Sequence, residues 1–75
     1  MNLQDFTAGL QTLLPYYKDP AGYHLGAEHD QIYLYVTDKP LSATDVQTMR
    51  DLGWFQPDQD DGEDYDPGQG WATFV

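Results

Sequence analysis

The sequence predicts an α+β fold in which two helices pack on one face of a small antiparallel sheet, in the order α-β-β-α-β-β. Three observations predict it: an N-terminal segment with helical apolar periodicity, a segment at 31–37 with strand alternation, and a helix start at Ser42 matched by a stop at Gly53. With 75 residues, 40% of them hydrophobic, the chain is expected to form one domain, 1–75, with a small core.

The first helix is predicted from an apolar stripe near the N-terminus. Its members recur at three- and four-residue steps: Leu3, Phe6, Leu10, Leu13 and Tyr17. Asn2 is placed to cap this helix, and Asp5 falls in its first turn, where a negative charge is favourable. Pro15 is expected to end or kink it.

A β-hairpin is predicted to follow. The segment 31–37 alternates with period two and is rich in branched and aromatic residues, which is typical of a strand. Three of its side chains are expected to face the core: Ile32, Leu34 and Val36. Tyr33 and Tyr35 then lie on the opposite face. Residues 22–25 are predicted to form a shorter strand, joined to the first through a turn at 26–30.

The second helix has the clearest local signals. Ser42 and Asp45 stand at capping-box spacing, with Asp in place of the more usual Glu, and Leu41 and Val46 can form a hydrophobic staple. Gly53 is the expected left-handed residue after the helix.

Two further strands, Trp54–Phe55 and 71–75, are predicted to pair with each other. Prolines and glycines between them indicate an irregular loop over 57–70, which we call the acidic loop.

The charge balance excludes several function classes. Thirteen acidic residues oppose only three basic ones, Lys18, Lys39 and Arg50, for a net charge of -10. This charge repels nucleic acid and anionic lipid and attracts basic surfaces. The chain has no cysteine, and no apolar run approaches the ~20 residues that span a bilayer. We therefore expect a cytoplasmic protein that binds neither nucleic acid nor membrane directly.

A calcium loop is the first alternative for the acidic loop. With Gly62 as the sixth position of an EF-hand, the first and twelfth positions fall on Pro57 and Gly68, which cannot supply side-chain oxygens. The motif fails, although looser binding of a hard cation by clustered carboxylates stays open.

Catalysis has little support in the sequence. His24 and His29, drawn with their acidic neighbours Glu28 and Asp30, suggest a metal or acid-base site, but this spacing favours a strand residue and a solvated turn residue. The Asp60–Asp61 and Glu63–Asp64 pairs lack the apolar surroundings that would separate their pKa values. Ser42 is better explained as a cap than as a nucleophile. No enzyme activity, cofactor or metal site is predicted.

The acidic loop could serve solubility alone, but its charge density favours a presented surface. Clustered like charges cost stability in a domain this small, so a function is expected to offset that cost. Carboxylates two residues apart on an extended chain lie about 6.6 Å apart, twice the ~3.4 Å charge spacing of one DNA strand. The predicted partner-binding residues are Asp58, Asp60, Asp61, Glu63, Asp64, Tyr65 and Asp66.

Four segments together resemble small acidic phage and prophage proteins that inhibit bacterial defence complexes. They are the strand DQIYL at 30–34, the helix start LSATD at 41–45, the helix exit LGWF at 52–55 and the terminal GWATFV at 70–75. The nearest class is the anti-CRISPR proteins of the DNA-mimic type. The resemblance implies a bacterial host cell as the location and a basic nucleic-acid-binding host protein as partner, such as a Cas subunit of a type I effector complex. It assigns no individual residue.

Two other functions stay open. A small phage adaptor or structural module could bind a partner, or a second copy, through an uncharged face at Tyr33 and Tyr35. A cation-binding domain is the third possibility. The oligomeric state and the identity of the partner do not follow from the sequence.

Overall fold

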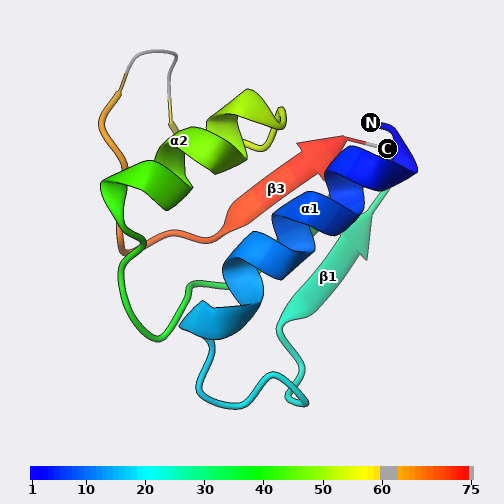
Figure 1. Cartoon of the computed structure of the whole chain (residues 1–75). Coiled ribbons are helices and arrows are strands. Elements are labelled where there is room, and N and C mark those ends of the chain that lie inside the picture. The colour runs from blue at the N-terminus through cyan, green and yellow to red at the C-terminus, as the bar shows by residue number, and fades with distance from the viewer. Residues whose placement is uncertain (60–62, 75) are drawn as a thin grey trace.

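A computed structural model describes residues 1–59 and 63–74 and has the element order α-β-β-α-β (Figure 1). The elements are α1 (Leu3–Leu13), the 3₁₀ turn η1 (Leu14–Tyr16), β1 (Leu25–Glu28), β2 (Gln31–Leu34), α2 (Ala43–Asp51) and β3 (Trp71–Phe74). The predicted α+β class with an antiparallel sheet is confirmed. The predicted order α-β-β-α-β-β is wrong, because the described residues contain three strands.

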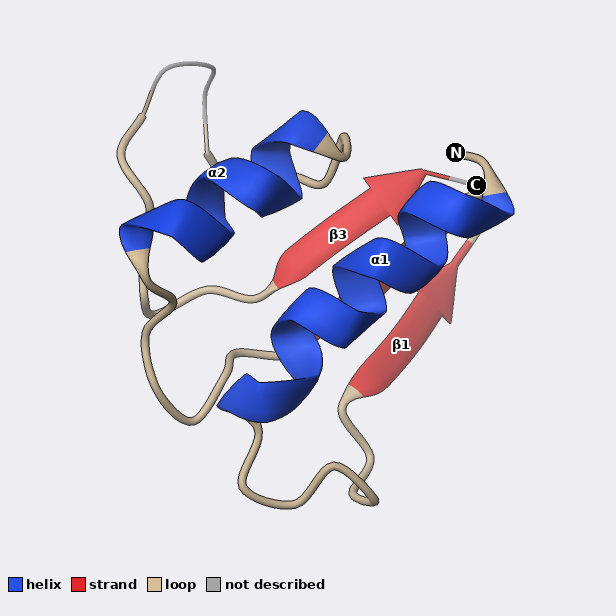
Figure 2. Cartoon of the chain, in the orientation of Figure 1, coloured by secondary structure: helices blue, strands red, loops and turns tan. Residues whose placement is uncertain are grey.

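The sheet has the strand order β1-β2-β3, and both pairs are antiparallel. Figure 2 shows α1 crossing in front of the sheet, and α2 lying next to β3. Leu34 of β2 faces Trp71 of β3 in the register, and both side chains are buried on the α1 side. Neither helix, among the residues described, has the length and apolar content needed to cross a membrane.

The fourth predicted strand is reduced to a single bridge. Phe55 exchanges two backbone hydrogen bonds with Ala72, at 2.9 and 2.7 Å, so the chain does pass beside β3 where expected. Pro57 lacks an amide hydrogen, and the intervening Gln56 turns its side chain into the interior. The pairing therefore stops after one residue pair.

The hairpin exists, but its first strand is shifted along the chain. Strand β1 covers Leu25–Glu28 instead of 22–25, and the turn is limited to His29 and Asp30. His29 adopts a φ of 55°, in the left-handed region that two-residue hairpin turns require. The segment before β1 instead makes a turn closed by the Gly22 amide on the Asp19 carbonyl, at 3.0 Å.

Strand β2 also ends earlier than predicted. Leu34 is buried as expected, but Val36 lies beyond the strand and is exposed, so its predicted core position is wrong. The Tyr35 carbonyl accepts a hydrogen bond from the Tyr17 hydroxyl at 2.5 Å, and the Asp38 amide donates to the backbone carbonyl of Tyr16 at 3.0 Å. These bonds, to the last residue of η1 and to the residue after it, draw the chain away from the sheet.

Helix α1 begins and ends as predicted. The Asn2 side chain accepts from the Asp5 amide at 2.7 Å, and the α-helix gives way to η1 at Leu14, one residue before Pro15. The predicted stripe is correct except at Leu3, which is exposed. Leu3 instead lies with Gln4, Thr7 and Gln11 along the outer surface of α1.

Helix α2 has both predicted ends. The Ser42 hydroxyl accepts from the Asp45 amide at 3.2 Å, and Gly53, with a φ of 93°, follows the helix. The Gly53 amide donates to the Arg50 carbonyl and the Trp54 amide to the Met49 carbonyl, both at 3.0 Å, which is the Schellman pattern. The Ser42 amide is bound by the Tyr16 hydroxyl rather than by the short Asp45 side chain, so the capping box forms only in part.

The core lies between α1, α2 and the sheet. Its buried apolar side chains are Leu13, Tyr17, Leu34, Leu41, Val46, Met49, Trp54 and Trp71. Trp54 packs directly on the backbone of Gly9, where any Cβ would overlap the indole ring, and it stacks on Phe6. Gly9 therefore sets how closely α1 approaches the segment after α2.

Candidate functional site

The acidic loop is fastened at its base by one buried amide. Gln56, only 4% exposed, donates to the backbone carbonyls of Asp66 at 2.8 Å and Gln69 at 3.3 Å, and it accepts from the Asp66 amide at 2.9 Å. The Asp58 amide in turn meets the Gln69 side chain at 3.4 Å. The two ends of the loop are thus joined side chain to backbone, without a strand ladder.

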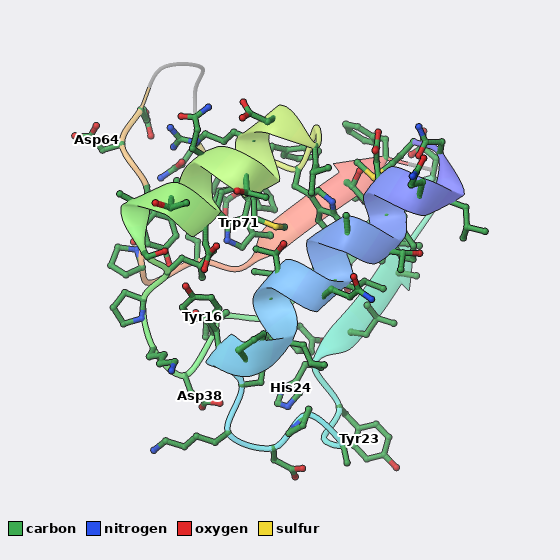
Figure 3. The ribbon with its side chains drawn as sticks, viewed as in Figure 1. Tyr16, Tyr23, His24, Asp38, Asp64 and Trp71 are labelled. Atoms are coloured by element: carbon green, nitrogen blue, oxygen red, sulfur yellow. The ribbon has the colours of Figure 1, made fainter. Side chains whose placement is uncertain are left out.

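Further contacts hold residues 63–65 of the loop. Gln59 donates to the Asp64 carbonyl at 2.8 Å, and Arg50 of α2 donates to the Glu63 carbonyl at 3.0 Å. Tyr65 stacks on buried Trp71, with ring centroids 6.0 Å apart, and its hydroxyl accepts from the Leu41 amide at 3.1 Å. Trp71 is seen inside the molecule in Figure 3.

The five predicted partner-binding residues that the structure describes divide into two groups. Asp58, Glu63 and Asp64 are exposed, and Figure 3 shows Asp64 pointing away from the body. Tyr65 and Asp66 are half-buried. The Asp66 carboxylate accepts from the Gly68 amide at 2.8 Å and from Gln69 at 3.1 Å, so both of its oxygens are used within the loop. Asp60 and Asp61 lie outside the described residues.

The exposed carboxylates of the loop have no cationic partner among the described residues. Arg50 is directed to a backbone carbonyl, and the Lys39 ammonium lies 5.5 Å from the centre of the Tyr16 ring. Across the described ranges the single contact between an acidic and a basic side chain is Glu28 with His29, at 4.0 Å on the surface, and it is an ion pair only when His29 is protonated. The negative charge of the loop is therefore not neutralised from within the described chain.

The two histidines do not form a common site. His24 stacks on Tyr17, with ring centroids 4.4 Å apart, and its Nε2 donates to the Asp19 carbonyl at 2.5 Å. His29 is exposed in the hairpin turn. Among the residues that the structure describes, no three His, Cys, Asp or Glu side chains are grouped in a way that could hold a metal ion.

Tyr17 has a shifted acidity. Burial raises the pKa of Tyr17 to about 12, and the negative charge of Asp38 and the proximity of Tyr65 add to the shift. The hydroxyl donates to the Tyr35 carbonyl, a bond that needs the neutral phenol. Its role in the described structure is to fasten the chain after β2.

The sheet face opposite α1 carries Tyr33 and Tyr35. Tyr33 and Tyr35 meet edge to face, 5.9 Å apart, and Phe55 stacks on half-exposed Phe74 at 5.1 Å. A groove of about 480 Å³ runs along this face. It is lined by Gln31, Tyr33, Leu34, Tyr35, Val36, Pro57, Asp58, Gly68, Gln69 and Gly70.

Comparison with protein-family models, with curated proteins and with solved structures found no match to this chain.

Sequence reasoning missed the residues that position the acidic loop. Gln56, Gln59 and Gln69 bracket the acidic residues, and each bonds to backbone or side-chain groups of the loop. Their signal in the sequence is the recurrence of neutral amides within a strongly acidic segment. Such amides can both donate and accept without adding charge.

Proposed function

We propose that this protein is a non-enzymatic acidic inhibitor that occupies a basic nucleic-acid-binding site on another protein. The observation that carries the proposal is the way the acidic loop is held: neutral amides fasten its backbone while Asp58, Glu63 and Asp64 are exposed. A surface whose charges are positioned before binding loses less conformational entropy when a partner binds it.

The partner class follows from charge and placement. Exposed carboxylates without internal counterions favour a surface rich in Lys and Arg, and long-range attraction accelerates the encounter. A groove that normally holds DNA or RNA has this character. In its most specific form, which rests on the resemblance to DNA-mimic anti-CRISPR proteins, the proposal names a Cas subunit of a type I effector complex in a bacterial cell.

The experiment is a competition assay. A purified type I effector complex is incubated with labelled target DNA and increasing amounts of the protein, and bound DNA is measured by mobility shift. The wild-type protein should displace DNA. The loop variant Asp58→Asn/Glu63→Gln/Asp64→Asn should inhibit at least about tenfold more weakly, because close charge pairs across interfaces couple by ~1.5 kcal/mol or more.

A matched control removes the same charge elsewhere. Asp19→Asn/Glu28→Gln/Asp30→Asn changes the net charge from -10 to -7, as the loop variant does, since each replaces three acids. It should inhibit nearly as well as the wild-type protein. Equal loss in both variants would mean that total charge, and not the acidic loop, is responsible; full inhibition by a folded loop variant would refute the proposal.

A second candidate is an interaction module without DNA mimicry. The groove on the aromatic sheet face favours it, since Tyr35 is 53% exposed and Phe74 56% exposed. Tyr and Phe are enriched at protein interfaces. Under this alternative, Tyr35→Ser would abolish partner binding, salt would have little effect, and the loop variant would bind normally.

A further inference from the structure

Strand β1 forms an outer edge of the sheet, and its outward backbone groups have no strand partner within the described chain. The Tyr35 amide donates to the His24 carbonyl at 2.9 Å, so His24 belongs to a hydrogen-bonded pair with β2. Along an antiparallel ladder, hydrogen-bonded residue pairs alternate with pairs whose amides and carbonyls point away from the partner strand. The amide and carbonyl groups of Leu25 and Ala27 therefore point to the open edge. Figure 2 shows β1 at the outside of the fold.

An apolar groove of about 320 Å³ lies beside this edge, between β1 and α1. It is lined by Leu10, Leu14, Tyr17, Pro20, Gly22, His24, Leu25 and Leu34. Leu14 and Leu25, at its mouth, are 54% and 60% exposed. Open backbone groups next to an apolar pocket are the two elements by which sheet edges bind extended peptides.

The charge around this edge selects the occupant. Residues 19–38 include Asp19, Glu28, Asp30 and Asp38 but no Lys or Arg. Glu28 and Asp30 are exposed at the far end of β1 from the groove. A second copy of the chain would bring the same acidic residues and a further charge of -10, so pairing between copies is opposed.

We propose that β1 binds an extended segment of another protein as an additional strand. The segment hydrogen-bonds to Leu25 and Ala27, inserts one large apolar side chain between Leu14 and Leu25, and places a Lys or Arg beside Glu28 and Asp30. This site is separate from the acidic loop and does not depend on the function proposed for it.

Tyr23 supports a binding role for this edge. Its side chain is 99% exposed, two residues before Leu25, and Figure 3 shows it extending away from the body. A tyrosine so exposed adds almost nothing to the packing of the fold, whereas tyrosine is among the residues that most often dominate binding energy. Its replacement therefore separates binding from folding.

The test uses a displayed library of random peptides of about 12 residues, a length that covers a four-residue strand and its flanks. Peptides selected on the wild-type protein should share an apolar residue flanked by Lys or Arg. With a selected synthetic peptide, the Leu25 and Ala27 amides should gain protection from hydrogen exchange. Failure to select any peptide, or protection at other amides only, would overturn the proposal.

Two variants remove the two elements of the site. Ala27→Pro deletes an outward amide that the sheet ladder does not use, and Leu25→Asn places a polar group at the groove mouth. Each should weaken the selected peptide about fivefold to tenfold, equivalent to ~1 to 1.4 kcal/mol. Tyr23→Ala should weaken it without lowering the melting temperature. Leu3→Asn, at another exposed leucine, is the matched control and should bind normally.

Charge variants separate this site from the acidic loop. Glu28→Gln/Asp30→Asn should weaken the peptide about threefold at low salt and much less at high salt, as expected for exposed charges. Asp58→Asn/Asp64→Asn, which removes the same charge from the acidic loop, should leave peptide affinity unchanged. The reverse pattern would place the peptide on the loop and refute the edge site, while leaving the proposed inhibitor function intact.

Discussion

The described parts of the acidic loop, 57–59 and 63–70, and strand β1 lie on opposite sides of the molecule in Figure 1, and their backbone groups are bound in different ways. The loop is irregular, yet Gln56 and Gln59 bind its backbone groups. Strand β1 is regular, yet Leu25 and Ala27 direct their amides and carbonyls outward. The comparison teaches that an irregular segment can have its backbone groups bound by side chains, while a regular edge strand leaves some of its backbone groups open.

Of the changes considered, removal of the buried Gln56 amide should lower the free energy of unfolding most. Gln56→Ala leaves backbone groups of Asp66 and Gln69 without their partner in a buried setting, so the free energy of unfolding should fall by about 2 to 4 kcal/mol. Urea unfolding measures the loss. Gln47→Ala, which removes an exposed amide bonded to Asp51, is the control and should change stability by less than about 0.5 kcal/mol.

A smaller effect is expected at Tyr65. Tyr65→Phe keeps the stack on Trp71 but removes the hydroxyl that accepts from the Leu41 amide, so stability should fall by about 1 kcal/mol. Thermal unfolding measures it. Tyr23→Phe, which removes an exposed hydroxyl, should leave the melting temperature unchanged. A neutral result for Tyr65→Phe would show that the hydroxyl bond to Leu41 adds nothing to stability and that Tyr65 contributes through its stack on Trp71.

Tyr17 tests the same kind of anchor through pH. Its pKa is raised in the fold to about 12 from an ordinary value of 10.0, so the neutral form is favoured when folded. The associated stability is fully present below pH 10.0 and is lost as the pH rises through about 12. Tyr17→Phe should therefore show a shallower loss of stability across this window in urea unfolding. Parallel curves would contradict the assignment.

The smallest effect is expected at the edge strand. Leu25→Asn should change the free energy of unfolding by less than about 0.5 kcal/mol, because the side chain is mostly exposed. Urea unfolding of this variant beside Leu34→Asn provides the contrast, since Leu34 is buried in the core. A large loss at Leu25 would mean that the groove belongs to the folding core.

Local signals in the sequence predicted the helices well. The Asn2 and Ser42 caps and the Gly53 stop depend on groups within a few residues, and each formed as expected. The sheet was predicted less well because pairing depends on distant residues. The shift of β1 follows from the two-residue turn at His29 and Asp30, which does not contain the glycine usual in such turns. The early end of β2 follows from the hydrogen bond between the Tyr17 hydroxyl and the Tyr35 carbonyl, two residues that are distant in the sequence.

The candidate site stays a prediction: the sequence indicates where the acidic residues cluster, but not how the segment that carries them is held. Composition placed the charge at 58–66, and the exposure of Asp58, Glu63 and Asp64 agrees with a surface position. The uses of Asp66 within the loop and of Gln56 beneath it were not predictable. Both depend on how the segment after α2 passes β3, which only the assembled fold determines.

The salt dependence of inhibition tests the central claim most directly. DNA binding by a type I effector complex is measured with the wild-type protein and with Asp58→Asn/Glu63→Gln/Asp64→Asn, from about 50 mM to about 200 mM salt. We expect wild-type inhibition to weaken steeply with salt and the variant to be weak throughout, so that the two converge. Inhibition that is insensitive to salt, or equal for both proteins at low salt, would contradict the account.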